Sequence, residues 1–235
     1  MTWERTVSQA YGRIVAIHAR HLAAVTDVLP WWWQAQDDLE PEHHVAIDPA
    51  WDDPLTMVRD LEFWVAEHAT AAVFVHAGVV AVGGRALLLP GRSFVGKSSL
   101  TAALLRAGAT YGSDEYAVIT PDGLVHPYPR RLVIRRDGGL DRVPAAELGA
   151  DTMTGPARLH TVADLHFSDG APWAVEPFER SRVMLSLLDN SVAATSRPIA
   201  VLDALVAATA SLETAIGGVR GDADVAAGEL LRLLG

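Results

Sequence analysis

The sequence has 235 residues, half of them hydrophobic, with a formal net charge of −10 and no cysteine. This length suits one large α/β domain or one domain with a small extension, and the lack of cysteine excludes disulfides, cysteine–zinc sites and cysteine nucleophiles. The negative charge argues against a nucleic-acid partner, because nucleic-acid phosphates usually need a basic face.

The sequence gives no sign of a membrane segment. The longest apolar stretch, residues 71–82, contains His76 and is too short to span a bilayer. The N-terminus lacks a basic region followed by an apolar run, which is the pattern of a signal peptide. We therefore expect a cytoplasmic protein with no membrane partner.

The N-terminal part carries a mixed signal. Residues 5–29 alternate polar and apolar side chains in places, which fits either strands or a short helix. Three tryptophans at 31–33 follow Pro30, and the acidic stretch 34–44 is typical of an irregular exposed loop. The tryptophans could form an acceptor-docking or dimer surface, or pack in a core. Apolar residues at helical spacing predict a helix over 55–68.

The central part has a clearer pattern. Residues 73–82 form an apolar, β-rich run, Gly83-Gly84 makes a turn, and residues 85–90 predict a buried strand. A glycine-containing segment follows, and residues 97–106 then have the spacing of a helix, which Gly108 ends.

The remaining elements alternate between strands and helices, which is typical of a compact α/β unit. Strands are predicted at 116–120, 124–126, 132–134, 162–167 and 215–219, with turns at 121–123 and 137–139, and helices at 179–188, 198–212 and 222–234.

The segment between the strand at 85–90 and the helix at 97–106 fits a phosphate-binding loop. It matches the pattern G-x-x-x-x-G-K-[ST], and Lys97 is the single lysine of the chain. The loop N–H groups and the helix N-terminus would surround a phosphate, Lys97 would reach the β- and γ-phosphates, and Ser98 would bind Mg²⁺. The expected nucleotide-binding residues are Gly91, Arg92, Ser93, Phe94, Val95, Gly96, Lys97, Ser98 and Ser99.

Two further features carry potential chemistry. Asp114 and Glu115 directly precede a predicted strand, and two adjacent carboxylates can divide the work of phosphoryl transfer, one holding Mg²⁺ and the other accepting a proton. A charged turn is the alternative interpretation. His76 lies within a predicted apolar strand, where it could be a core residue or could reach the phosphate site.

The order and spacing of these motifs resemble the C-terminal catalytic domain of bacterial HPr kinase/phosphorylase. The resemblance covers residues 73–136: His76-Ala77-Gly78, a hairpin, the loop 15 residues after His76, and the Ser113-Asp114-Glu115 segment. It implies that α/β fold, which is related to phosphoenolpyruvate carboxykinase, and the use of ATP and Mg²⁺. It further implies that residues 71–235 form the P-loop catalytic domain and residues 1–70 a small α/β extension packed on it.

By position, the resemblance also implies residue roles. Asp114 matches the family's catalytic aspartate, His76 its active-site histidine and Lys97 its loop lysine, whereas Ser98 and Glu115 match residues associated with the metal. Phe94 stands where the family has a third glycine, and the family's separate regulatory N-terminal domain is not recognisable. The chain is therefore more similar to short HPr kinase-related proteins, some of which phosphorylate a serine of a precursor peptide during peptide maturation.

These observations predict an ATP- and Mg²⁺-dependent kinase that acts on a hydroxyl, with serine as the expected acceptor, of a peptide, a protein or a small molecule. Arg131, Arg135 and Arg197 are candidate acceptor contacts, with a solvated surface as the alternative. We also expect a homo-oligomer. The rival hypothesis is a non-catalytic nucleotide-binding sensor, which would bind ATP without turnover.

Overall fold

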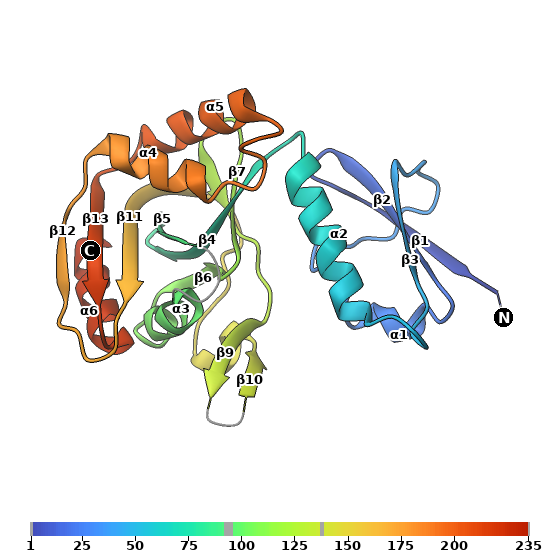
Figure 1. The fold of residues 1–235 in the computed structure, drawn as a ribbon, viewed down its shortest axis with the longest axis horizontal. Coiled ribbons are helices and arrows are strands. Elements are labelled where there is room, and N and C mark those ends of the chain that lie inside the picture. Colours follow the sequence, from blue (N-terminus) through green and yellow to red (C-terminus); the bar gives the residue numbers. More distant parts are fainter. Residues whose placement is uncertain (1, 92–95, 137–138, 235) are drawn as a thin grey trace. The chain divides into compact units, whose positions relative to one another are not determined.

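The computed structural model of the protein describes residues 2–91, 96–136 and 139–234. Its internal contacts divide the chain into two compact units, residues 1–72 and residues 73–235 (Figure 1). In the described part of the chain, no helix combines the length and the apolar character needed to cross a membrane.

The first unit is a small three-stranded sheet with one long helix. Strands β1 (Glu4–Ala10) and β2 (Arg13–Ala19) form a hairpin, and β3 (His43–Ile47) adds to β2 in parallel. The short helix α1 (Ala23–Thr26) follows β2. Helix α2 (Pro54–His68) has proline in its first turn and is capped by the Asp53 carboxylate, which accepts a hydrogen bond from the Leu55 N–H.

One expectation for this unit needs correction. Residues 34–44 were expected to be an irregular loop, but His43 and His44 begin β3, where pairing with β2 supplies their backbone hydrogen bonds. The tryptophan segment is only partly exposed. Trp31 is half exposed, whereas Trp32 is buried and the Trp33 indole N–H donates to Thr6 Oγ1 over 3.2 Å. Large indole rings gain most when they pack against other apolar atoms, which explains this burial.

The second unit is built on a mixed eight-stranded sheet. Its main path runs β12 (Ala174–Pro177), β13 (Thr214–Arg220), β11 (Ala157–Phe167), β5 (Arg85–Pro90), β4 (Val73–Val82), β7 (Tyr116–Ile119) and β8 (Leu124–His126), and β6 (Thr110–Ser113) pairs with β4 beside β7. Strand β11 is parallel to β5 and to β13, whereas the other pairs are antiparallel. The start of β11 also pairs with β8, which closes the strands β4, β5, β11, β8 and β7 into a ring.

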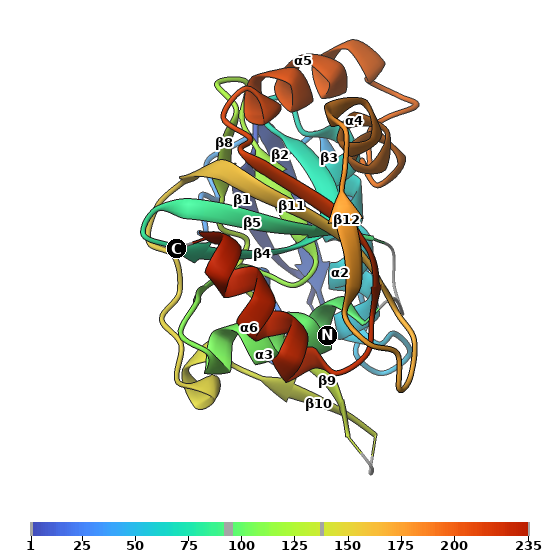
Figure 2. The same ribbon diagram turned by 90° about the vertical axis from the view of Figure 1, so that its left-hand side faces the viewer.

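Helices cover both faces of this sheet, as Figure 2 shows. Helices α3 (Lys97–Arg106) and α6 (Ala223–Leu234) pack side by side on one face, and α4 (Arg180–Asp189) and α5 (Pro198–Thr209) pack together on the other. Each face has its own apolar core, one with Leu87 and Leu104 and the other with Leu88 and Leu205. Because Leu87 and Leu88 are consecutive in β5, their side chains point to opposite faces, which is how one strand feeds both cores.

The mixed α/β architecture with a central sheet is confirmed, as are the five predicted helices, whose ends shift by up to three residues. The sequence analysis missed four strands: β3, β6, β10 (Gly139–Val143) and β12. Strand β10 pairs with β9 (Leu132–Arg136) in a two-stranded hairpin, and a short 3₁₀ helix, η1 (Ala145–Leu148), follows. The predicted turn at 137–139 lies largely outside the described residues.

Candidate functional site

The candidate site begins where β5 ends and α3 begins. Gly91 follows β5 with φ of 148°, and Gly96 caps α3 in the left-handed region with φ of 83°. Both values favour glycine, because a side chain on either residue would be strained. The Gly91 N–H donates to the carbonyl oxygen of His76 over 3.1 Å, which ties the start of the loop to β4. The expected contacts Arg92, Ser93, Phe94 and Val95 lie outside the described residues.

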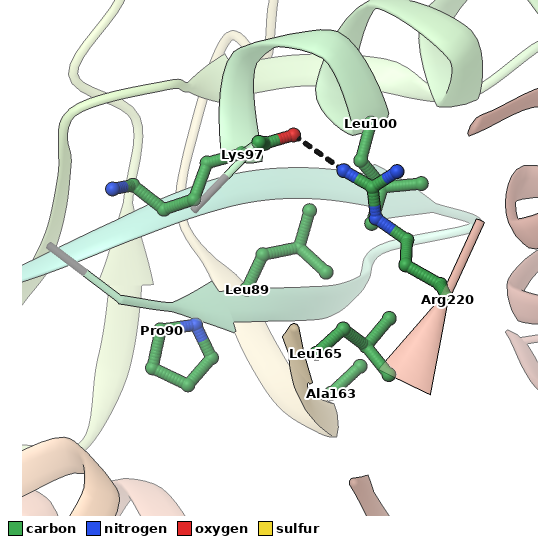
Figure 3. Close-up of a pocket in the computed structure, with 8 residues that line it drawn as sticks. Leu89, Pro90, Lys97, Leu100, Ala163, Leu165 and Arg220 are labelled. Atoms are coloured by element: carbon green, nitrogen blue, oxygen red, sulfur yellow. Dashed lines mark hydrogen bonds between the residues drawn. The ribbon is translucent and has the colours of Figure 1, made fainter. Parts of the chain in front are cut away.

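Lys97 is the first residue of α3 and is partly buried. Burial lowers the pKa of its ammonium, while the nearby Glu115 and Asp114 carboxylates act in the opposite direction. Figure 3 shows the Lys97 side chain extending away from Arg220. The single lysine therefore lies at the helix N-terminus within the field of the acidic pair.

Asp114 lies at the centre of a hydrogen-bond network and is only 5% exposed. Its Oδ2 accepts hydrogen bonds from Ser98 Oγ at 3.1 Å and from the Val133 N–H at 3.4 Å, and its Oδ1 accepts one from the Tyr111 hydroxyl at 3.0 Å. Burial raises the pKa of Asp114, although the Arg130 charge and these hydrogen bonds oppose the shift. The carboxylate joins Ser98 of α3 to β6 and to the start of β9.

The Glu115 side chain is more exposed to solvent than that of Asp114 and has different neighbours. Its carboxylate lies 3.8 Å from His76 Nδ1 and 3.7 Å from the Arg130 guanidinium, and its side chain is about one-third exposed. The backbone supports this arrangement, because the Glu115 carbonyl accepts the Ala77 N–H and Ser113 Oγ accepts the Glu115 N–H. His76 on β4 and the acidic pair between β6 and β7 therefore meet near Lys97 at the start of α3.

Arg220 is a site residue that the sequence analysis missed. It ends β13, is 2% exposed, and donates from Nη2 to the Gly96 carbonyl over 2.7 Å and from Nη1 to the Gly221 carbonyl over 3.1 Å (Figure 3). Burial lowers the pKa of the guanidinium. A Cβ on Gly96 would lie 2.5 Å from Arg220 Nη2, so a side chain there would displace the guanidinium. The glycines on both sides of Val219-Arg220 were the only signal in the sequence.

Arg220 also lines a small space beside Gly96 and Lys97. This space, of about 10 Å³, is lined by Leu89, Pro90, Leu100, Ala163 and Leu165 together with Gly96, Lys97 and Arg220 (Figure 3). It holds a water molecule at most, so it is too small to be a ligand site.

The three arginines proposed as acceptor contacts are not brought together by the described residues. Arg131 is exposed and directly precedes β9, Arg135 lies on β9 with a side chain outside the described set, and Arg197 precedes α5 on the other face of the sheet. Their neighbour Arg130 joins the site through Glu115. The contact role of Arg131, Arg135 and Arg197 stays a prediction.

The site offers oxygen ligands for a hard cation. Among the described residues no three histidine, aspartate or glutamate side chains converge as a ready metal site. Mg²⁺, however, usually binds through one or two carboxylates together with substrate phosphates and water. The hydroxyl of Ser98 and the carboxylate of Asp114, which touch each other, fit that donor set.

Comparisons with known proteins add little to this picture. No family model matches the sequence, and no curated protein matches it. Among solved structures, the chain is similar to the HPr(Ser) kinase/phosphatase from Coxiella burnetii, with 16% sequence identity over 68% of this chain and 93% of that chain. The TM-score of 0.35 is too low for this likeness to carry an argument, so the function must be inferred from the geometry.

Proposed function

We propose that this protein is a Mg²⁺-dependent phosphotransferase that moves the γ-phosphoryl group of ATP to a hydroxyl group. The observation that carries the proposal is the 3.1 Å hydrogen bond from Ser98 Oγ to Asp114 Oδ2. It joins the serine that follows the loop lysine to a buried acid 16 residues later, on the neighbouring strand connection. Such a pair is the usual support for Mg²⁺ and the terminal phosphates in P-loop enzymes.

The start of α3 supplies the phosphate contacts. The free N–H groups of a helix N-terminus attract anions, and Lys97 adds a full positive charge at the same end. Gly91 and Gly96 let the backbone approach a ligand closely, since neither carries a Cβ. Ser98 and Asp114 would hold Mg²⁺, which supplies charge neutralisation when bound.

The two carboxylates divide the remaining work according to their surroundings. Asp114 is buried and occupied by Ser98 and Tyr111, which suits a role at the metal. Glu115 is open to solvent beside His76, which suits acceptance of a proton from an incoming hydroxyl. The resemblance to HPr kinase implies the reverse, with Asp114 as the catalytic residue and Glu115 at the metal. Substitution of each carboxylate distinguishes these two assignments.

The reaction is a simple displacement at phosphorus. The acceptor hydroxyl oxygen forms a bond to the γ-phosphorus, the bond from that phosphorus to the β–γ bridging oxygen breaks, and ADP leaves. The hydroxyl proton passes to the carboxylate of Glu115. Arg130, 3.7 Å from Glu115, adds positive charge at the same place. The acceptor is a hydroxyl of a peptide, a protein or a small molecule.

The test measures ATP binding and ATP consumption separately. Calorimetric titration of the whole protein with ATP and Mg²⁺ should show binding, and incubation with MgATP should release ADP slowly, with water as the acceptor. Binding without any ADP release, also in the presence of serine peptides and small alcohols, would instead identify a nucleotide sensor. No binding to the wild-type protein would refute the proposal.

A further inference from the structure

A second cavity opens beside the N-terminus of α3. It has a volume of about 580 Å³ and lies between the turn that follows β11 and the start of α6. Its walls are formed by Gly96, Ser99, Phe167, Asp169, Gly170, Ala171, Arg220, Gly221, Asp222 and Ala223. Cavities of roughly 300–1,000 Å³ are the ones that hold small organic ligands in proteins.

The rim of this cavity is built from two segments that are held firmly together. The Ser168 N–H donates to the Arg220 carbonyl over 2.9 Å, and the Ala171 N–H donates to the Ser168 carbonyl over 3.1 Å. A Cβ on Gly221 would lie 2.1 Å from the Ala171 carbonyl oxygen, so the β11–β12 turn touches the β13–α6 junction directly. The cavity is therefore part of the fold.

The direction of the phosphate chain follows from two consecutive serines. Ser98 donates to Asp114, and the proposed function assigns this pair to Mg²⁺ and the transferred γ-phosphoryl group. Ser99, one residue later, lies about 100° further around the helix and lines the cavity instead. The cavity beside Gly96 and Ser99 therefore offers space for the nucleoside of a triphosphate whose γ-phosphate lies at Asp114.

The walls carry the groups that a nucleoside needs. Phe167 is 52% exposed and presents an aromatic ring for base stacking. The carboxylates of Asp169 and Asp222 can accept hydrogen bonds from ribose hydroxyls or from base amino groups. Arg220 lies over the Phe167 ring at 5.3 Å, and its buried Nε has no hydrogen-bond partner among the described residues.

We propose that this cavity, with Phe167 as its stacking wall and Arg220 as its buried cation, receives the ribose and base of the nucleoside triphosphate. The inference rests on the proposed phosphotransferase function and names a binding subsite for its donor. It predicts that affinity for the donor has two separable parts, one from the phosphates at Lys97 and one from the nucleoside at Phe167.

The experiment compares two ligands on the whole protein by calorimetric titration. MgATP carries the nucleoside, and magnesium tripolyphosphate lacks it. Phe167→Ala should weaken MgATP binding by roughly 5- to 150-fold, the range of base–aromatic stacking, and leave tripolyphosphate binding within about twofold. Phe63→Ala is the matched control, because Phe63 is 48% exposed but lies in the first unit. It should change neither affinity.

A second measurement detects contact between the protein and the nucleoside directly. Saturation-transfer NMR of ATP should show strong transfer to the base and ribose protons in the wild-type protein and weaker transfer in Phe167→Ala. Unchanged MgATP affinity in Phe167→Ala, together with its loss in Lys97→Ala, would overturn the cavity proposal and leave the phosphotransferase proposal standing. If wild-type protein binds neither ligand, the proposed function itself fails, and the subsite with it.

Discussion

Lys97 has an ammonium whose pKa is lowered by burial, while the nearby Glu115 and Asp114 carboxylates act in the opposite direction. Its replacement by alanine should remove tight binding of MgATP, because the β- and γ-phosphates lose their only lysine. Calorimetric titration measures the effect. Arg232→Ala is the control, since Arg232 also carries one positive charge but lies on the exposed surface of α6, and it should leave the affinity unchanged.

The acidic pair gives the sharpest test of the chemistry. Glu115→Gln should lower the rate of phosphoryl transfer by roughly 10²–10⁴-fold, the usual contribution of a general base, and should leave MgATP affinity nearly unchanged. Asp114→Asn should instead reduce the dependence of ATP affinity on Mg²⁺. The opposite pattern, with Asp114→Asn impairing only the rate, would return the base role to Asp114.

The buried Asp114 carboxyl should also make the stability of the folded protein depend on pH. Its pKa is raised in the folded protein, so folding favours its protonated form. This contribution is fully present below the unfolded-state pKa of about 3.9 and is lost as the pH rises through the folded-state pKa. Asp114→Asn should therefore gain thermal stability relative to wild type at pH 8, and the gain should shrink as the pH falls toward 4. A gain that is the same at every pH would contradict burial of the charge.

Residues that share a local motif were predictable, whereas residues joined by the fold were not. Gly91, Gly96, Lys97 and Ser98 stand in one segment whose strand and helix neighbours have clear periodicity. Arg220 is 124 residues away from Gly96 in the sequence, so only the parallel pairing of β13 with β11 brings it to the loop. A buried arginine has no periodic signature, which is why sequence reasoning passed over it.

At the scale of the elements, the contact between β4 and α3 positions the site. Gly78, two residues after His76, faces Thr101 of α3, and a Cβ there would lie 2.8 Å from Thr101 Oγ1. Gly78→Ala should therefore destabilise the protein by about 1–3 kcal/mol, the usual cost of overpacking a core. Urea denaturation measures this change.

Gly228 provides the matched control for the substitution of Gly78. It lies within α6, and a Cβ there would meet nothing within 4 Å. Gly228→Ala should stabilise the protein by about 1 kcal/mol, because alanine favours the helical backbone. Equal effects from the two substitutions would mean that β4 and α3 are not packed as closely as described.

The strands that the sequence failed to show are the ones that depend most on their partners. Strand β12 is exposed, ends at Pro177 and pairs only at the sheet edge with β13. Strand β6 has four residues and pairs with β4 across an irregular register. Neither has the alternating pattern that marks a strand locally, so its conformation depends on pairing with a neighbouring strand. Longer buried runs such as β4 carry that signal themselves.

At the scale of the whole molecule, the proposed site lies entirely within residues 73–235. Each of the two units has its own internal contacts, so a ligand that touches one unit should protect that unit alone. Hydrogen exchange with and without MgATP should show slower exchange at the start of α3, around Asp114 and at the β13–α6 junction. Amides of β1, β2 and β3 should exchange at unchanged rates, and protection there would show that the first unit responds to the nucleotide.

The whole chain carries a single lysine, and burial shifts its side chain toward the neutral amine. The neutral amine is the form that reacts with acylating reagents, so Lys97 and the α-amino group are the only ordinary targets for such labels. A label located on Lys97 rather than on the α-amino group would thus record the state of one side chain. Lys97 can therefore act as a built-in reporter of whether a phosphate ligand covers it.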